Sequence, residues 1–256
     1  MLSQKEIWEI ARRQSALDLN CAPEEFLKTE PVLCRGGLGP GAKKYYQEPV
    51  ACNFVSYGSN VVASALESCR DIAGEYIQKF PFYHCFETPN LHWLDERLEP
   101  LGQKVCFMAE YFLPRPEAVR ALPCAYPLRV LEPTDFSCLY LPEWSNALCE
   151  KRKELDVLAV GAYDGNRLIA LAGCSADAER MRQIGIDVLP AYRGRGVGAA
   201  CVSRLALEIL QRNLVPFYCA AWSNLPSVRT ALKCGFLPAW TEMTVKPRET
   251  VEEMNR

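Results

Sequence analysis

The chain has 256 residues, which is long enough for one large domain or two of ordinary size. Its 49% hydrophobic and 23% charged residues are typical of a soluble globular protein, and its net charge of −2 argues against a broad basic surface for nucleic acid. No apolar run approaches the roughly 18 residues of a membrane helix, and the charged N-terminus lacks the apolar core of a secretory signal. We therefore expect a cytoplasmic protein without nucleic-acid or membrane partners.

The 13 cysteines form no recognisable disulfide or zinc pattern. Their number is odd, and no two of them have a Cys-x-x-Cys spacing. Several of them, such as Cys106, Cys201 and Cys219, lie within apolar stretches, and the two histidines are His84 and His92. A structural zinc site has little ligand support, so we expect no metal and reduced cysteines that serve as small core residues.

The first half of the chain alternates between helical and extended patterns. Residues 3–17 predict an amphipathic helix. The glycine-rich stretch 35–46 lacks the Ser or Thr that follows Gly-Lys in a phosphate-binding P-loop, so we expect a flexible loop, with a substrate-facing lid as the alternative. Residues 50–57 predict a strand, 61–80 a helix and 104–112 a further strand.

A proline-marked stretch at 113–127 is the best candidate for a domain boundary. We expect an N-terminal α/β domain over residues 1–122 and a second domain over 123–256. In the second domain, Thr134 and Asp135 predict a helix cap, and the Asp-Gly-Asn turn at 164–166 predicts a hairpin. The expected strands are 128–131, 157–163, 167–173, 183–189, 215–221 and 237–245, and the expected helices are 197–212 and 225–233.

Two segments hint at an internal repeat. Residues 79–90 and 214–224 share Pro-Phe-Tyr, a nearby cysteine and a terminal asparagine. The same offset aligns Val61 with Gly196 and Ala63 with Gly198, so any first copy is degenerate. A degenerate duplication of the second domain is therefore one hypothesis for the N-terminal domain.

The most informative stretch is IDVLPAYRGRGVGAA, residues 186–200. A strand ends, a short turn follows, and residues 193–198 open a helix. The glycines let backbone N–H groups converge on an anion, and Arg193 and Arg195 add cationic hydrogen bonds, which together predict a diphosphate site. The letters GRGVGA also match a dinucleotide fingerprint, but the motif lies too far from the strand, and the next strand has no acidic residue.

This region resembles the GNAT superfamily of acetyl-CoA-dependent N-acetyltransferases. Arg193, Gly196 and Gly198 fill its Arg/Gln-x-x-Gly-x-Gly/Ala pattern at a helix start. A second match, to the family's Asn-x-x-Ala…Lys-x-Gly-Phe pattern, consists of Asn224, Ser227, Lys233, Gly235 and Phe236. The resemblance covers residues 127–246 and implies an α/β (α+β) fold, with a mixed, twisted sheet flanked by helices whose strands 4 and 5 splay apart.

The resemblance also implies where acetyl-CoA would bind as co-substrate. The pyrophosphate would rest on the backbone amides of 193–198, the pantetheine arm would pair with the backbone of 186–188, and Asn224 would face the cofactor. Alternatives stay open, because Arg193 and Arg195 also fit a solvated loop and Asn224 also fits a helix N-cap. The implied cofactor-binding residues are Ile186, Asp187, Val188, Arg193, Gly194, Arg195, Gly196, Val197, Gly198 and Asn224.

The family's usual acid–base residues are missing. Its strand-5 glutamate is replaced by Cys219 and its helix tyrosine by Ala231. Because thiols have a pKa near 8.5, a thiolate can leave without full protonation, so the missing acid slows the reaction rather than forbidding it. Water could remove the amine proton, and three residues are also candidates for the catalytic groups. Each has a structural alternative: Asp187 could be a partner for an arginine, Tyr218 could pack in the core, and Glu242 could be a surface charge.

The leading function is therefore an N-acetyltransferase that transfers acetyl to an amine of a small molecule or amino-acid-like acceptor by direct attack on the thioester. The alternative is a catalytically silent acyl-CoA-binding or regulatory protein, which the residues at 219 and 231 would suit. The acceptor and the oligomeric state are not encoded in any pattern of the sequence.

Overall fold

The computed structural model describes residues 2–46 and 50–256, and the chain forms two compact units. Unit 1 contains Met1–Ile10 and Phe112–Pro238, and unit 2 contains Ala11–Tyr111 and Ala239–Arg256. The sequence boundary between residues 122 and 123 falls inside the long stretch of unit 1, and a division into domains at that point stays a prediction.

Unit 2 contains a sheet of mixed direction. Its strand order is β1-β3-β2-β10-β4, in which β1 is parallel to β3 and β2 is antiparallel to β3 and β10. The strands are β1 (Val32–Arg35), β2 (Cys52–Ser56), β3 (Val62–Ala65), β4 (Gln103–Pro114) and β10 (Phe236–Pro247). The helices associated with this unit are α1 (Gln4–Leu19), α2 (Arg70–Lys79), α3 (Thr88–Leu98) and α6 (Arg248–Met254).

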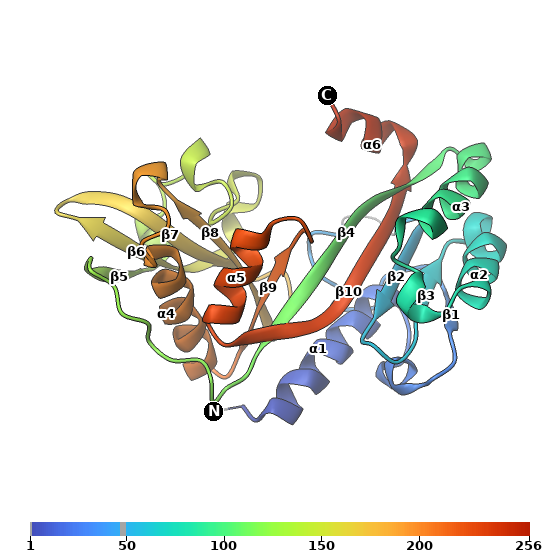
Figure 1. Cartoon of the computed structure of the whole chain (residues 1–256), viewed down its shortest axis with the longest axis horizontal. Coiled ribbons are helices and arrows are strands. Elements are labelled where there is room, and N and C mark those ends of the chain that lie inside the picture. The colour runs from blue at the N-terminus through green and yellow to red at the C-terminus, as the bar shows by residue number, and fades with distance from the viewer. Residues whose placement is uncertain (1, 47–49) are drawn as a thin grey trace. The chain divides into compact units, whose positions relative to one another are not determined.

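The two faces of this sheet differ in chemistry. One face carries Phe54, Ala63 and Met243 and packs against α2 and α3 (Figure 1). On the other face, Asn53 stands opposite both Ser64 and Thr244 in the strand register. All three polar side chains are buried. Unit 2 therefore buries a row of polar groups on this face, beside the buried valines Val55 and Val62.

The helix predicted for residues 61–80 is wrong in its first half. Residues 62–65 form β3, whose ladder with β2 runs from the pair Val55–Val62 to the pair Cys52–Ala65. The β-branched valines at 61 and 62 favour this extended state, and the helix α2 begins at Arg70. The alignment of residues 79–90 with residues 214–224 is also wrong. The first Pro-Phe-Tyr leads into the 3-10 helix Phe82–His84, whereas the second lies in a strand.

Unit 1 holds strands in the order β9-β8-β7-β6-β5. The helix α4 packs across β6, β7 and β8, and the predicted hairpin turn has Gly165 in the left-handed region, with φ 60°. The strands are β5 (Leu128–Leu131), β6 (Asp156–Asp164), β7 (Arg167–Ser175), β8 (Met181–Val188) and β9 (Val215–Ala220), and the helices are α4 (Val197–Gln211) and α5 (Leu225–Lys233). Short 3-10 helices occur in both units. Those of unit 2 are η1 (Pro23–Leu27), η2 (Glu67–Cys69), η3 (Phe82–His84) and η4 (Glu99–Leu101), and those of unit 1 are η5 (Pro133–Asp135), η6 (Pro142–Trp144), η7 (Glu150–Leu155) and η8 (Pro190–Tyr192).

The buried face of α4 carries apolar side chains and one serine. Val197, Cys201, Leu205 and Ile209 are each at most 2% exposed. Ser203 is also fully buried, and its hydroxyl donates to the carbonyl oxygen of Arg120. A buried hydroxyl is tolerated when such a partner is present.

The cysteines are free thiols, and three of those in the core are chemically quiet. Burial raises the pKa of Cys174, Cys201 and Cys234 to about 12, because a thiolate is poorly solvated there. In the part of the chain that the structure describes, no helix is long and apolar enough to cross a bilayer.

Candidate functional site

The site in unit 1 is built where two parallel strands part. The pairing of β8 with β9 begins at Met181–Val215 and ends at Ile184–Tyr218, although β8 continues to Val188. Gly185–Val188 remain paired with β7 on their other side. Over the described residues of this stretch, the backbone groups of β8 that point toward β9 have no ladder partner, so they can accept an extended ligand.

The glycine motif forms a tight turn at the start of α4. Gly194 has φ 74° and Gly196 has φ 78°, a region that side chains rarely adopt, and Gly196 is the N-cap of the helix. A Cβ added at Gly198 would lie 3.0 Å from Cγ2 of Val188, so this glycine lets the helix start pack against the end of β8. The first-turn amides of α4 have no acceptor within the helix, and the turn presents them beside the strand that parts from its neighbour.

Three cationic side chains gather at this helix start. Nε of Arg193 donates to the carbonyl oxygen of Val188 at 3.0 Å, and the guanidinium of Arg195 lies 5.7 Å from the ring centroid of Tyr192. Nζ of Lys233, at the end of α5, lies 3.7 Å from the position of a Cβ at Gly196. These like charges stand at the positive end of the helix dipole, an arrangement that an anion would stabilise.

Lys233 belongs to the second GNAT sequence motif, but the sequence alone did not predict a role for its side chain. We expect Lys233→Ala to weaken acetyl-CoA binding about fivefold to tenfold, because an exposed charge contact with a phosphate contributes about 1 kcal/mol. The affinity of the variant should also depend less on salt concentration than that of the native protein. Calorimetric titration at two salt concentrations checks this, with the exposed Lys151 replaced by alanine as the control. Equal losses in both variants would show that Lys233 is not at the phosphates.

Asn224 joins α5 to β9 through a short chain of hydrogen bonds. Its Oδ1 accepts from the backbone N of Ser227 at 3.3 Å, which confirms the predicted N-cap. The hydroxyls of Ser227 and Tyr218 are 2.8 Å apart. The cap uses the Oδ1 of Asn224, so its amide nitrogen is the group left to face a ligand.

Asp187 lies on the opposite face of the sheet from Tyr218. In the strand register Tyr218 shares a face with Ile184, while alternation places residue 187 on the other side. The carboxylate of Asp187 accepts from the backbone N of Asn146 at 2.9 Å, from its Nδ2 at 2.6 Å and from the backbone N of Ala147 at 3.0 Å. Its partners are thus amides and not the arginine considered from the sequence.

The segment that Asp187 holds runs close over two glycines. Gly173 and Gly185 are paired across β7 and β8, and a Cβ at either one would lie within 2.0 Å of a carbonyl oxygen of Asn146 or Ala147. This segment continues the core, because Trp144, Ala147 and Leu148 pack with residues of β5, β6 and β7.

A sequence model described as GNAT acetyltransferase matches residues 103–239, which is more than half of the chain. The chain belongs to the GNAT acetyltransferase family.

Solved structures of GNAT proteins resemble this chain at low identity. A GCN5-related N-acetyltransferase-like protein from Streptococcus suis is 20% identical, with a TM-score of 0.46 over 60% of this chain and 67% of its own. A protein described as a GNAT-family acetyltransferase from Novosphingobium aromaticivorans is 22% identical, with a TM-score of 0.42 over 56% of this chain and 66% of its own. A GCN5-related N-acetyltransferase from Kribbella flavida is 15% identical, with a TM-score of 0.44 over 77% of this chain and 86% of its own. No curated protein matches the sequence.

Neither usual GNAT acid–base position holds the family's residue here. Cys219 is half-buried, and its Sγ lies 3.2 Å from Nε2 of Gln183. Ala231 is fully buried on α5. Any acid–base group of this GNAT protein would therefore come from other positions.

The three catalytic candidates are not brought together. Tyr218 is 2% exposed, and burial raises its pKa, so the phenol stays protonated at neutral pH. Glu242 lies in unit 2 and is 3% exposed, which makes the surface-charge alternative wrong. Its Oε1 accepts from Nδ2 of Asn53 at 3.0 Å and from the hydroxyl of Tyr46. Sequence patterns could not show this burial, because the donors come from distant segments.

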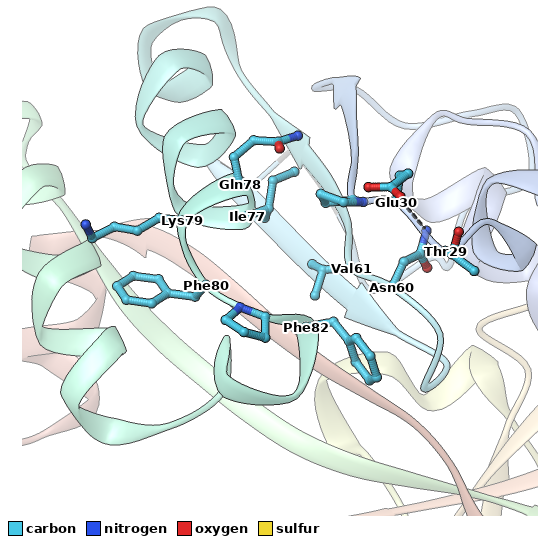
Figure 2. A pocket seen from close by; sticks show the side chains of 11 residues that line it. Thr29, Glu30, Asn60, Val61, Ile77, Gln78, Lys79, Phe80 and Phe82 are labelled. Carbon is cyan, nitrogen blue, oxygen red and sulfur yellow. Dashed lines mark hydrogen bonds between the residues drawn. The ribbon is translucent and has the colours of Figure 1, made fainter.

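Unit 2 also has a cavity of about 350 Å³ (Figure 2). Asn60 lines it, and its Nδ2 donates to the carbonyl oxygens of Glu25 and Glu30. Phe80 and Phe82 line another part of it. All of its lining residues belong to unit 2, so it is not part of the turn at α4. Among the described residues, no group of three or more His, Cys, Asp or Glu side chains is placed to hold a metal ion.

Proposed function

We propose that this GNAT protein is an acetyl-CoA-dependent N-acetyltransferase that acts on an amine of a small molecule or amino-acid-like acceptor. The observation that carries the proposal is the left-handed glycine turn at Gly194 and Gly196, which lies at the start of α4 with three cations around it. A turn of this kind offers converging amides and positive charge, which is the requirement of a diphosphate.

The residues of the turn fit the cofactor as follows. The amides of 193–198 would hold the pyrophosphate, with Arg193, Arg195 and Lys233 supplying charge. The unpaired edge of β8 at 186–188 would hold the extended pantetheine arm by main-chain hydrogen bonds. Nδ2 of Asn224 would donate to the same arm. When bound, acetyl-CoA supplies the activated acetyl group as a thioester.

In the reaction, the nitrogen of a neutral amine attacks the thioester carbonyl, the C–S bond breaks, and one amine proton is lost. We propose Tyr218 as the group that donates a proton to the departing sulfur, with the half-buried Ser227 as the hydroxyl between it and the ligand. The amine proton would leave to water, because Asp187 lies on the opposite face of the sheet from Tyr218 and its carboxylate holds the backbone at Asn146 and Ala147. We do not assign the base to Glu242, because its Oε1 already accepts from two donors inside unit 2.

The direct test measures CoA thiol release from acetyl-CoA over a panel of amines, with acetyl-CoA binding measured in parallel. We expect thiol release that depends on at least one amine. Tight acetyl-CoA binding with no release over any amine would instead support the silent acyl-CoA-binding function, which the uncharged residues Cys219 and Ala231 favour.

We expect Tyr218→Phe to lower kcat about tenfold and to leave acetyl-CoA affinity unchanged. The effect stays below the usual range for a general acid because a thiolate leaves readily. Steady-state kinetics on whichever amine is accepted, together with calorimetric titration, checks this. Tyr140→Phe, in a tyrosine outside the proposed site, is the control. An unchanged kcat in the Tyr218 variant would leave the departing sulfur to be protonated by water.

A further inference from the structure

The cavity of unit 2 is lined by the end of a helix. Residues 77–79, the last turn of α2, belong to its lining. The N–H of Phe80 donates to the carbonyl oxygen of Tyr76, and Pro81 has no N–H to give to the carbonyl oxygen of Ile77. The last carbonyl groups of α2 therefore have no partner within the helix. They form the negative end of the helix dipole, where a cation is stabilised.

A buried side-chain amide supplies a further acceptor. Asn60 lines the cavity and is 1% exposed. Its Nδ2 donates to the carbonyl oxygens of Glu25 at 2.9 Å and Glu30 at 3.0 Å, which fixes the amide, because the opposite orientation would set Oδ1 against two acceptors. Within the described part of the chain, this buried Oδ1 has no hydrogen-bond partner. A ligand N–H would satisfy it and remove the cost of an unpaired acceptor.

The charges at the cavity also favour a cation. Its two charged lining residues are Glu30, which is exposed, and Lys79. Nζ of Lys79 lies 5.7 Å from the ring centroid of Phe80 and 5.9 Å from that of Trp93. Figure 2 shows this side chain extending away from Glu30 and Asn60. The ammonium of Lys79 is thus turned toward aromatic rings, and the carboxylate of Glu30 is the charge left to meet a ligand.

We propose that this cavity binds a small organic cation that carries a primary ammonium on an aromatic body. Its volume of about 350 Å³ is that of a small-molecule site. The ammonium has three donors, which suit the carbonyl groups of 77–79 and Oδ1 of Asn60. Phe80, Phe82 and Val61 supply apolar surface for the aromatic body. The lining residues all belong to unit 2, so this ligand is additional to the substrates of the proposed acetyl transfer.

The test titrates the native protein with phenethylamine, without acetyl-CoA, and follows the ligand by saturation-transfer NMR. Its amine is protonated at neutral pH, as a lysine amine is. We expect saturable binding with a dissociation constant of about 1 mM, a typical value for so small a ligand. Two probes of similar shape should bind at least about tenfold more weakly. They are 2-phenylethanol, with a hydroxyl in place of the ammonium, and 3-phenylpropanoate, with a carboxylate.

Two charge reversals locate the binding site. Glu30→Lys should weaken phenethylamine binding about tenfold, because it replaces the attracting charge by a repelling one. Glu24→Lys is the matched control, since Glu24 is also exposed but does not line the cavity, and it should change affinity less than about twofold. The proposal is overturned if phenethylamine does not bind saturably, if the neutral or anionic probe binds equally well, or if the two reversals have equal effects. Because acetyl-CoA is absent, each of these outcomes leaves the proposed acetyl transfer to its own test.

Discussion

Gly196→Glu is expected to weaken acetyl-CoA binding by at least about 100-fold. A carboxylate at the N-cap of α4 would stand where the diphosphate is proposed to bind, and placing like charges side by side costs several kcal/mol. The new side chain has room, since the nearest atom to a Cβ there is Nζ of Lys233 at 3.7 Å. The new carboxylate would also pair with Lys233. The diphosphate would then lose the attraction of that lysine and be repelled by the carboxylate. Calorimetric titration with acetyl-CoA measures the effect.

Two controls separate charge from backbone strain. Gly165→Glu introduces the same side chain at φ 60°, in the β6–β7 turn, where a Cβ meets nothing within 4 Å. It should leave affinity unchanged. Gly196→Ala carries the strain of φ 78° without the charge, a cost of about 1–2 kcal/mol that acts mainly on stability. An affinity of Gly196→Glu close to the native value would place the cofactor elsewhere.

Lys43→Met is expected to destabilise the fold by about 3–5 kcal/mol, because it leaves a buried carboxylate without its counter-charge. Nζ of Lys43 lies 2.6 Å from Oδ2 of Asp18, and both side chains are 1% exposed. Burial alone would lower the pKa of Lys43, but the attraction of Asp18 and other neighbouring groups raises it well above its usual range. The lysine is therefore charged, and Asp18 depends on it. Urea denaturation followed by circular dichroism gives the free energy of unfolding.

The neighbouring Lys44 supplies a matched control, since it is exposed. Lys44→Met should change the free energy of unfolding by no more than about 0.5 kcal/mol. A double variant, Asp18→Asn with Lys43→Met, removes both charges and should recover part of the loss. If Lys43→Met and Lys44→Met behave alike, the ion pair contributes nothing to stability.

Local chemistry was enough to predict much of unit 1. The bounds of α5 coincide with the expected 225–233, because Asn224 caps its start and Gly235 follows its end with φ 85°. The Asp-Gly-Asn turn at 164–166 gave the hairpin in the same way. These signals act over a few residues, so a sequence displays them completely.

The failures come from partners distant in the chain. The loop at 35–46 was expected to be flexible, yet Lys43 is pinned inside it by Asp18, 25 residues earlier. Glu242 was predicted as a catalytic candidate with a surface charge as the alternative, but it is buried and accepts from Tyr46 and Asn53. Nothing near either residue signals burial, because the compensating group is supplied by the fold and not by the neighbouring sequence.

The close passage of the Asn146–Ala147 backbone over β7 and β8 bears on how this protein can change. A Cβ at Gly185 would lie 1.8 Å from the oxygen of Asn146, and one at Gly173 would lie 2.0 Å from that of Ala147. Even alanine is therefore barred at both sites unless the crossing segment lifts away. In a saturation mutagenesis screen these two positions would tolerate as little change as a catalytic centre. The cause would be the lack of room between two backbone segments and not a role in the chemistry. Sequence changes that alter the site would therefore occur at the residues around this crossing.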